Sequence, residues 1–472
     1  MNLSRVAAWL SAAALIGAGG LVACRRPPTG APPNVVLIVL DTLRADRLGV
    51  YGNRRGLTPF LDQLAARGTR FANAYAPSSW TCPSIASLFT SRYPSQHRVT
   101  TFESALGADE VTLAERLRAD GYATVGFTAN FRIVESLGYT QGFTDWTAYF
   151  DGADGGPKPR GAMLRADSVR WLSARTDPSR PVFLYLQYME PHMPYEPPDP
   201  YLSRFGLPAS AAVRAAANEK LVAMRGDDLS EDDVALLESL YDAETAAVDE
   251  ELRLLFAELE RLGVLSNAVV LITADHGEEF REHGFLAHGL TLFEPAIRVP
   301  LILLAPGMRG GTVVEEAVSL IDLAPTVLDL VGAASEPRFV GRSLVPLLAP
   351  DSVVARLRAS VARFAGSPPP PDLLSELYPS AAFDLRAHQA AYLRVPQKLL
   401  LPTVGAPEQY DLSADPGERH PRTVYAGESG SELYTALQRR REALTRDAAP
   451  VGTPVQLDDA TREKLRALGY QP

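Results

Sequence analysis

The stretch that decides the fold is Asn34–Thr42, which reads NVVLIVLDT. Its six central residues are all apolar and mostly β-branched, which predicts a strand buried on both faces, as in parallel sheets. The apolar run stops abruptly at Asp41 and Thr42. A buried strand that ends in a carboxylate indicates an α/β sheet with a polar site at the carboxyl ends of its strands.

The rest of the chain repeats this pattern. Further apolar runs predict strands at 123–127, 181–188, 268–273 and 299–304. Amphipathic periods between them predict helices at 58–67, 111–120 and 229–262. Strands that alternate with helices predict an α/β fold, with a mostly parallel sheet sandwiched by helices.

Polar residues follow three of these predicted strands. Asp41 follows the first, Glu190 and His192 follow the third, and Asp275 and His276 follow the fourth. Because the carboxyl ends of parallel strands meet at one edge of a sheet, we expect these groups to gather there. This placement is the strongest indication of an active site that the residues give without any comparison.

Length and composition set the organisation. The 472 residues, 46% of them hydrophobic and 22% charged, suffice for one large domain and a smaller section. We expect a catalytic domain at 34–345 and, at 346–472 after a proline-rich break, a C-terminal α+β subdomain with strands at 391–395 and 398–401. The net charge of -10 argues against a nucleic-acid partner, since phosphate backbones favour clustered basic surfaces.

The N-terminus has the features of a targeting segment. Arg5 precedes an apolar stretch at 6–22 that ends in Leu-Val-Ala-Cys24. This ending resembles the lipobox of bacterial lipoproteins, which implies a signal peptide at 1–23, a lipid on Cys24 and a place in the bacterial cell envelope. Residues 24–33 read as a proline-rich tether. The alternative is an uncleaved membrane anchor; either way the domain is exported and tethered to the membrane.

The segment Ser78–Thr90, SSWTCPSIASLFT, contains the candidate nucleophile. Thr81 is of the type that caps helices, and Pro83 is tolerated in a first turn, so a helix is expected to start here. A hydroxyl at a helix start meets free backbone N–H groups and the positive end of the dipole, which suits attack on an anionic ester. The alternative is that Thr81 is only a helix cap.

The chain resembles the sulfatases and their relatives in the alkaline phosphatase superfamily, over residues 34–345. The resemblance rests on several blocks that occur in the family's order: Asn34–Arg44, Thr81–Ser84, Arg92–Pro94 with His97, Glu190–Tyr195, Thr273–Glu278, His288-Gly289, Arg298–Pro300, and Tyr410–Leu412 with Asp415-Pro416. It implies a sulfatase-like α/β fold and a metal-dependent hydrolase of sulfate or phosphate esters.

The resemblance also implies roles for individual residues. Asp41, Asp275 and His276 match the family's metal ligands. Thr81 matches the nucleophile, which also contacts the metal. His192 and His288 match positions that hold the charged group of the substrate or assist the leaving group.

Three departures bear on the substrate. Thr42 stands where many sulfatases have a second aspartate. Thr81 stands where true sulfatases have a Cys or Ser that becomes formylglycine, and Ile85 replaces the arginine of that motif. We therefore predict no formylglycine. Relatives with a threonine nucleophile are mostly phosphodiesterases, phosphatases and phosphotransferases, so sulfate and phosphate esters both stay open.

The donor set predicts one divalent metal ion. Two carboxylates, an imidazole and a hydroxyl suit Mn or Zn, whereas an all-oxygen set would suit Ca. Part of a second set could come from Glu190, His192, His283 and His288. We expect His97 to be structural, His283 to lie at the surface, and Glu278 and Glu279 to be solvated or to support the ligands.

Three functions follow from these observations. The first is hydrolysis of a small-molecule, glycan or lipid ester. The second is transfer of the phosphoryl group to an envelope alcohol, although no multi-span membrane domain accompanies it. The third is a non-catalytic binding lipoprotein, which the loss of the arginine at Ile85 favours and the retention of the four candidate metal ligands opposes.

Overall fold

The computed structural model describes residues 30–149, 160–208, 210–222, 229–348, 372–379, 388–402, 405–424 and 431–450, with five further positions between 455 and 463. The predicted signal peptide and the lipid site at Cys24 lie outside the described residues. Residues 33–472 form one compact unit, which is the part analysed below. In the ranges given above, none of the helices has the length and apolar character needed to span a bilayer.

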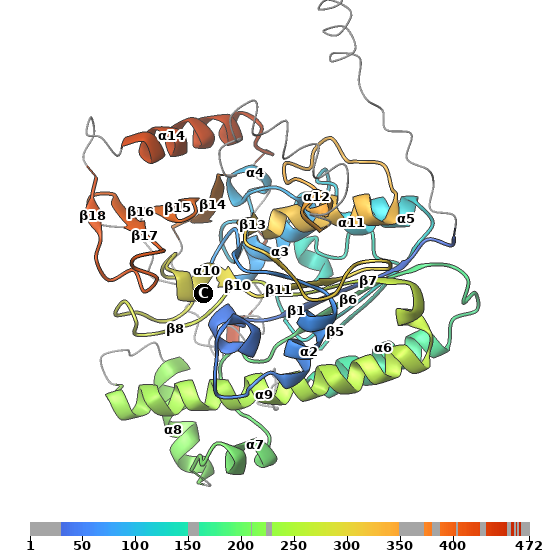
Figure 1. The fold of residues 1–472 in the computed structure, drawn as a ribbon, viewed down its shortest axis with the longest axis horizontal. Coiled ribbons are helices and arrows are strands. Elements are labelled where there is room, and N and C mark those ends of the chain that lie inside the picture. The colour runs from blue at the N-terminus through green and yellow to red at the C-terminus, as the bar shows by residue number, and fades with distance from the viewer. Residues whose placement is uncertain are drawn as a thin grey trace, which may run out of the picture. The chain divides into compact units, whose positions relative to one another are not determined.

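An eight-stranded sheet forms the centre of the fold, in the order β12-β2-β11-β7-β1-β6-β4-β5 (Figure 1). Strands β7, β1, β6, β4 and β5 run parallel, and β11 is antiparallel to both of its neighbours. The expected mostly parallel α/β sheet is therefore confirmed. Its strands are β1 Asn34–Leu40, β2 Thr69–Phe71, β4 Ala123–Thr128, β5 Asp145–Ala148, β6 Val182–Tyr188, β7 Ala268–Ala274, β11 Leu301–Leu304 and β12 Thr312–Val314.

The register of the central strands determines which residues leave the sheet next to one another at its carboxyl end. Strand β1 pairs with β7 so that Leu40 lies opposite Ala274, and with β6 so that Leu40 lies opposite Tyr188. All three strands are almost completely buried, which explains their continuous apolar sequences. The next residues, Asp41 and Asp275, consequently emerge side by side.

Helices cover both faces of the sheet, as Figure 1 shows. One face carries α2, α6 and the long α9, and the other carries α3, α5 and α11. Helices α7 and α8 pack on the outer side of α9. The bounds are α2 Pro59–Arg67, α3 Thr81–Thr90, α5 Leu113–Ala119, α6 Gly161–Ser173, α7 Asp199–Arg204, α8 Ala211–Val222, α9 Glu231–Arg261 and α11 Leu323–Val331.

Helix starts follow the capping signals of the sequence. Ser230 and Asp233 form a capping box at the start of α9, and Thr112 and Glu115 form one at the start of α5. Asp249 of α9 accepts hydrogen bonds from the first N–H groups of α2, those of Phe60 and Leu61. This carboxylate satisfies two free donors and ties the two helices together.

The predicted strand at 299–304 is broken in two. Strand β10 (Arg298–Val299) pairs with β3 (Ala74–Tyr75), whereas β11 joins the central sheet. Pro300 lies between them and has no N–H to donate to a ladder, so the chain changes sheets there. Strand β13 (Val318–Ser319) completes the three-stranded sheet, and β8 (Glu279–Phe280) pairs with β9 (Leu286–Ala287) in a hairpin.

An antiparallel sheet follows the central domain, as expected for the C-terminal subdomain. Its strands, in order, are β14 Leu373–Leu377, β15 Gln389–Arg394, β16 Gln397–Leu401, β17 Glu408–Asp411 and β18 Arg422–Thr423. Helix α14 (Ser431–Arg446) packs on this sheet, next to α4 (Pro94–His97). The two remaining short helices are α10 (Glu294–Ile297) and α12 (Val345–Leu348).

A buried ion-pair network joins this sheet to the central domain. The Lys398 ammonium of β16 lies 2.7 Å from a Glu418 carboxylate oxygen and 3.3 Å from one of Glu294 in α10. The Lys398 side chain is fully buried, and Glu418 also accepts a hydrogen bond from the Glu294 backbone N–H. Buried charges of this kind are stable only as a paired set.

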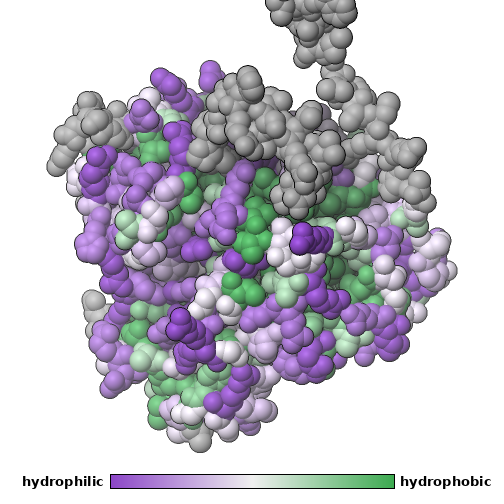
Figure 2. Space-filling model, viewed as in Figure 1, coloured by the Kyte–Doolittle hydropathy of each residue, from purple (hydrophilic) through white to green (hydrophobic). Residues whose placement is uncertain are grey.

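Hydrophilic side chains cover most of the face shown in Figure 2, with hydrophobic ones interspersed. The large apolar side chains that are exposed lie far apart in the sequence: Met163, Val213, Phe285 and Val313. Single exposed apolar residues are ordinary for a folded domain. The apolar material is otherwise collected in the core between the sheet and its helices.

His97 is a structural residue, as its sequence context indicated. Its Nε2 lies 2.9 Å from the Ser87 hydroxyl of α3, and its Nδ1 accepts the Val99 N–H at 3.1 Å. Burial lowers the pKa of His97 to about 3, and the positive charge of Arg92 acts in the same direction. The imidazole is therefore neutral in the folded protein and links α4 to α3.

We predict that His97→Gln lowers stability in a pH-dependent way. In the unfolded chain His97 titrates near its ordinary pKa, so its contribution is complete above about pH 6.5 and is lost as pH falls toward 3. At pH 7.5 the variant should be less stable by about 2 kcal/mol. The difference should shrink by up to about 1.4 kcal/mol for each pH unit below 6.5.

Denaturant unfolding at pH 7.5, 6 and 5 measures this effect. His420→Gln is the matched control, since the His420 side chain is 85% exposed and should show no such trend. A stability difference for His97→Gln that stays constant with pH would contradict the buried neutral state.

Candidate active site

Three side chains converge at the carboxyl ends of β1 and β7. The Asp41 and Asp275 carboxylates and the His276 imidazole offer ligand atoms that all lie within 4.8 Å of one another. His276 Nε2 is 3.7 Å from Asp41 Oδ1 and 3.6 Å from Asp275 Oδ2. All three side chains are fully buried. The structure thus brings Asp41 next to two residues that lie more than two hundred positions further along the chain.

Neighbouring groups hold the two carboxylates in place. Asn130, two residues after β4, donates its amide N–H to Asp41 Oδ2 at 2.7 Å. Asp275 Oδ1 accepts the backbone N–H groups of Thr42 and His276, at 3.2 and 3.0 Å. Asp275 Oδ2 is buried and accepts no hydrogen bond from any residue that the structure describes. A buried anionic oxygen in this state fits a bound cation.

The tautomer of His276 fits the same purpose. Its Nδ1 lies 2.9 Å from the Gly277 carbonyl, so Nδ1–H is the donor and the Nε2 lone pair faces the carboxylates. Burial lowers the pKa of His276, which keeps the ring neutral. An imidazole with one nitrogen fixed by a carbonyl and the other directed at carboxylates is the usual arrangement of a metal ligand. The donor set can therefore hold a divalent cation.

Thr81 reaches this group from the start of α3. The expectation that Thr81 caps the helix is wrong, because the cap position is occupied by Trp80 and Thr81 is the first helical residue. Its Oγ1 lies 3.3 Å from His276 Nε2, and the residue is 5% exposed. The hydroxyl is therefore directed at the candidate metal ligands and not at the helix backbone.

Thr42, where many sulfatases have an aspartate, contributes its backbone. It has a φ of 61°, in the left-handed region that β-branched residues rarely adopt, at a cost of about 1–2 kcal/mol. This conformation directs its N–H at Asp275 Oδ1. Its hydroxyl is buried and has no hydrogen-bond partner within the described ranges. Strain of this kind is typical of functional sites.

Two further imidazoles, those of His192 and His288, stand beside the group. The centroid of the His288 ring is 4.6 Å from that of His276 and 4.9 Å from that of His192. His288 Nδ1 lies 2.8 Å from Glu278 Oε1, and His192 Nδ1 contacts the Met193 carbonyl. Both residues that the resemblance assigned to substrate or leaving group thus lie at the site.

Glu278 and Tyr195 are further residues of the site; the sequence predicted Glu278 to be solvated or to support the ligands and gave Tyr195 no role of its own. The Tyr195 hydroxyl donates to Glu278 Oε2 at 2.9 Å, so the carboxylate joins Tyr195 to His288. Both residues are almost fully buried, and burial raises the pKa of Tyr195. Solvation of Glu278 is therefore ruled out; it supports His288. The placement of Glu278 three residues after Asp275 was the only available signal.

His283 and Glu279 were also misplaced by the sequence. Glu279 is buried and contacts the Thr291 hydroxyl, and its Oε1 lies 3.0 Å from His283 Nδ1. The His283 ring stacks on Phe293 at 3.7 Å, and its Nε2 lies 3.0 Å from the Gly417 carbonyl. His283 thus joins the β8–β9 hairpin to the C-terminal subdomain and does not supply a second metal set.

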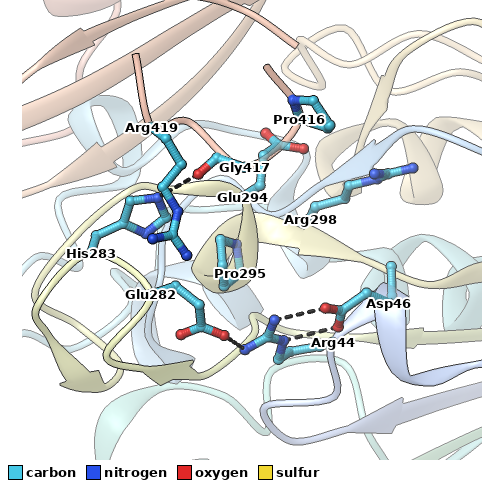
Figure 3. Close-up of a pocket in the computed structure, with 11 residues that line it drawn as sticks. Arg44, Asp46, Glu282, His283, Glu294, Pro295, Arg298, Pro416, Gly417 and Arg419 are labelled. Carbon is cyan, nitrogen blue, oxygen red and sulfur yellow. Dashed lines mark hydrogen bonds and ion pairs between the residues drawn. The ribbon is translucent and has the colours of Figure 1, made fainter. Parts of the chain in front are cut away.

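A cavity of about 190 Å³ lies next to this junction (Figure 3). Arg44 and Asp46, which follow the Asp41 loop, form one wall, and the loop at 416–419 of the C-terminal subdomain forms another. The remaining lining residues are Ala45, Glu282, His283, Glu294, Pro295 and Arg298. Positive and negative side chains occur in equal number around it if His283 is neutral, and none of the candidate metal ligands lines it.

At the position of the missing arginine, Ile85 is fully buried in the main core. A buried guanidinium nearby belongs to Arg132, two residues after Asn130. Its Cζ lies over the ring of Phe102, 5.5 Å from the centroid. It also lies near the thiol of Cys82. Burial raises the pKa of this thiol, and the positive charge of Arg132 offsets part of the rise. A cation therefore stands close to the start of α3, but it comes from another element.

The Asp-Asp-His group is buried, and the Thr81 hydroxyl at the start of α3 faces it. This arrangement has the form of a metal-assisted site for ester cleavage on an α/β sheet. The family model described as Sulfatase matches residues 33–333. This chain belongs to the sulfatase family, and it is an ester hydrolase of that family.

Individual relatives share most of the chain. Arylsulfatase K of Mus musculus is 26% identical over 467 residues, covering 89% of this chain and 81% of that protein. Arylsulfatase of Clostridium perfringens is 26% identical and covers 67% and 78%. The solved structure of phosphonate monoester hydrolase of Agrobacterium radiobacter superposes with a TM-score of 0.69 at 22% identity, covering 88% and 95%. This last likeness shows the shared fold.

We predict that Asp275→Asn weakens binding of a divalent cation by at least about 100-fold, because it removes the anionic oxygen that has no other partner. Titration of metal-free protein with Mn²⁺ and Zn²⁺ measures the affinity without turnover. Asp249→Asn is the matched control, since Asp249 is also buried and accepts two backbone N–H groups away from the site. Equal affinity in Asp275→Asn and the wild type would remove Asp275 from the ligand set.

Proposed function

We propose that this chain hydrolyses phosphate or sulfate esters through a covalent intermediate on Thr81. One observation carries the proposal: the Thr81 hydroxyl lies 3.3 Å from His276 Nε2, at the start of α3 and beside the candidate metal ligands. A hydroxyl that only capped the helix would face the backbone of its own first turn.

The residues that would hold a divalent cation are Asp41, Asp275, His276 and Thr81. When bound, the cation would lower the pKa of the Thr81 hydroxyl and polarise the ester oxygen. The imidazole favours Mn or Zn over Ca, which prefers oxygen ligands.

In the first step, Thr81 attacks phosphorus or sulfur as the alkoxide, after its hydroxyl proton has been lost to solvent, and the bond to the leaving oxygen breaks. Protonated His288 gives its proton to the leaving alkoxide, and the Glu278 carboxylate at 2.8 Å orients its ring. The free N–H groups in the first turn of α3, together with His192, stabilise the negative charge that develops on the transferred group.

In the second step, water attacks the ester on Thr81 from the side that the leaving group has vacated. His288, now neutral, takes the proton of this water. The bond to Thr81 breaks, free phosphate or sulfate departs, and the Thr81 oxygen is restored for the next cycle. The same histidine thus serves as acid and then as base.

Thr81 bears on the choice between sulfate and phosphate. Its side chain is a secondary alcohol, so oxidation would give a ketone and not the aldehyde of formylglycine. We therefore place phosphate esters first and sulfate esters second as substrates. By their names, arylsulfatase K acts on aryl sulfates, and phosphonate monoester hydrolase acts on phosphonate monoesters.

We also propose that the enzyme works in the bacterial envelope, anchored by a lipid on Cys24, on a small-molecule, glycan or lipid ester. The Leu-Val-Ala-Cys24 ending and the proline-rich tether after it support this placement. Incorporation of labelled fatty acid tests it: Cys24→Ser should abolish the label, and a label that persists would disprove the anchor.

We predict that Thr81→Ala lowers kcat by about 10³-fold or more, because the nucleophile is removed, and leaves the fold intact. Thr81→Ser keeps the hydroxyl and should retain a measurable part of the activity. Turnover is measured on aryl phosphate, aryl phosphodiester and aryl sulfate probes with each metal. Circular dichroism of each variant shows whether the fold is intact.

Acid quench and mass spectrometry of the wild type should locate a transferred group on Thr81. Undiminished turnover in Thr81→Ala would refute the nucleophile. Addition of an alcohol acceptor distinguishes hydrolysis from phosphotransfer, because a transferase would release an acceptor ester in place of free phosphate.

A further inference from the structure

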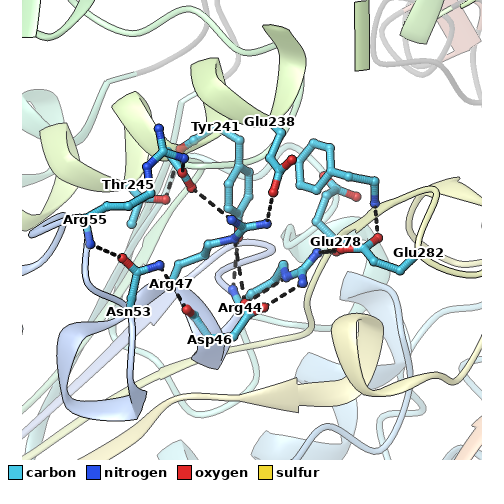
Figure 4. Close-up of polar contacts among 12 residues, drawn as sticks. Arg44, Asp46, Arg47, Asn53, Arg55, Glu238, Tyr241, Thr245, Glu278 and Glu282 are labelled. Atoms are coloured by element: carbon cyan, nitrogen blue, oxygen red, sulfur yellow. Dashed lines mark hydrogen bonds and ion pairs between the residues drawn. The ribbon is translucent and has the colours of Figure 1, made fainter. Parts of the chain in front are cut away.

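The hydroxyl of Tyr241 lies inside the loop that follows the candidate ligand Asp41. Tyr241 is a fully buried residue of α9. Its hydroxyl donates to the Thr42 carbonyl at 2.8 Å. It also accepts the Arg44 N–H at 3.0 Å, and Figure 4 shows Tyr241 beside Arg44. One side chain therefore pairs with two backbone groups within three residues of Asp41.

This loop depends on support from outside. Thr42 is held at a φ of 61°, a conformation that a β-branched residue does not keep by itself. Its N–H, in turn, holds Asp275 Oδ1 at 3.2 Å. The backbone of Thr42 thus holds the Asp275 carboxylate and directly follows Asp41 in the chain, and the Tyr241 hydroxyl fixes the carbonyl of the same residue.

The flank of the loop is anchored differently. The Arg44 side chain binds Asp46, Glu282 and the Glu278 carbonyl, and Arg47 forms an ion pair with Glu238 of α9 at 2.7 Å (Figure 4). These contacts fix residues 44–47. The strained residue Thr42 precedes this anchored segment, and the hydrogen bond from the Tyr241 hydroxyl to its carbonyl holds it.

A second tyrosine extends the arrangement to His288. The rings of Tyr195 and Tyr241 meet edge to face, with centroids 5.7 Å apart. The Tyr195 hydroxyl holds Glu278, which holds His288. Both tyrosines belong to a hydrophobic cluster separate from the core of the sheet, which includes Leu202 of α7, Leu221 of α8, Leu237 of α9 and Phe280 of β8.

We infer that Tyr241 and Tyr195 are positioning residues, through which this second cluster sets the metal ligands and His288 respectively. The inference rests on the proposed function, since it assumes that the Asp-Asp-His group binds a cation. Neither tyrosine touches the candidate ligands directly. Burial raises the pKa of both hydroxyls, so each remains a donor across the working pH range.

Tyr241→Phe tests the first half of the inference. It should weaken Mn²⁺ or Zn²⁺ binding by about tenfold, because the Thr42 carbonyl and the Arg44 N–H lose their shared partner. Tyr51→Phe is the matched control: the Tyr51 hydroxyl also donates to a carbonyl, that of Phe71, and accepts an N–H, that of Leu301, away from the ligands. It should leave the affinity unchanged.

The strain argument is tested by a rescue. Glycine adopts positive φ without penalty, so Thr42→Gly should reduce the effect of Tyr241→Phe from about tenfold to about threefold. If Tyr241→Phe alone does not fold, the double variant compared with Thr42→Gly carries the same test. Equal affinity with and without the Tyr241 hydroxyl in both backgrounds would overturn the inference.

Tyr195→Phe tests the second half. It should leave metal affinity unchanged, lower kcat about tenfold and alter the pH–rate profile with little change in KM, because only the support of His288 is lost. An unaltered kcat and pH–rate profile would overturn this half. A wild-type protein that binds neither ion would instead refute the proposed function, which makes the two failures distinguishable.

Discussion

The parallel pairing of β1 with β7 is the contact on which the site depends. Leu40 lies opposite Ala274, so Asp41 and Asp275 leave the sheet at the same level. A shift of one residue would send one carboxylate to the other face of the sheet. Both strands are buried on both faces, and their apolar runs stop at the same level, just before Asp41 and Asp275. The position of two charged groups is therefore determined by hydrophobic packing.

The sequence was sufficient for the four long central strands and for bringing Asp41, Asp275 and His276 together, since apolar runs that end in Asp or His carry both signals together. It was not sufficient where conformation decides. Nothing local shows that Trp80 occupies the cap position and Thr81 the first helical turn, because φ and ψ settle this. The break at Pro300 depends on pairing with a distant strand, and the burial of Glu278 depends on Tyr195.

Two separate hydrophobic clusters support the site. The core of the sheet holds the strands that carry Asp41 and Asp275, and the smaller cluster under α7, α8 and α9 holds the loops beyond them. The hydroxyls of Tyr241 and Tyr195 link the smaller cluster to the residues of the site.

The buried Lys398 network has a consequence for how the chain can be divided. The ammonium comes from the C-terminal sheet, whereas one of its two carboxylate partners, Glu294, comes from α10, which follows His288 in the chain. Removing that sheet would take away the cation that pairs with Glu294, together with apolar residues such as Leu393 and Leu400 that the sheet contributes to the main core. The central domain and the C-terminal sheet therefore share one hydrophobic core.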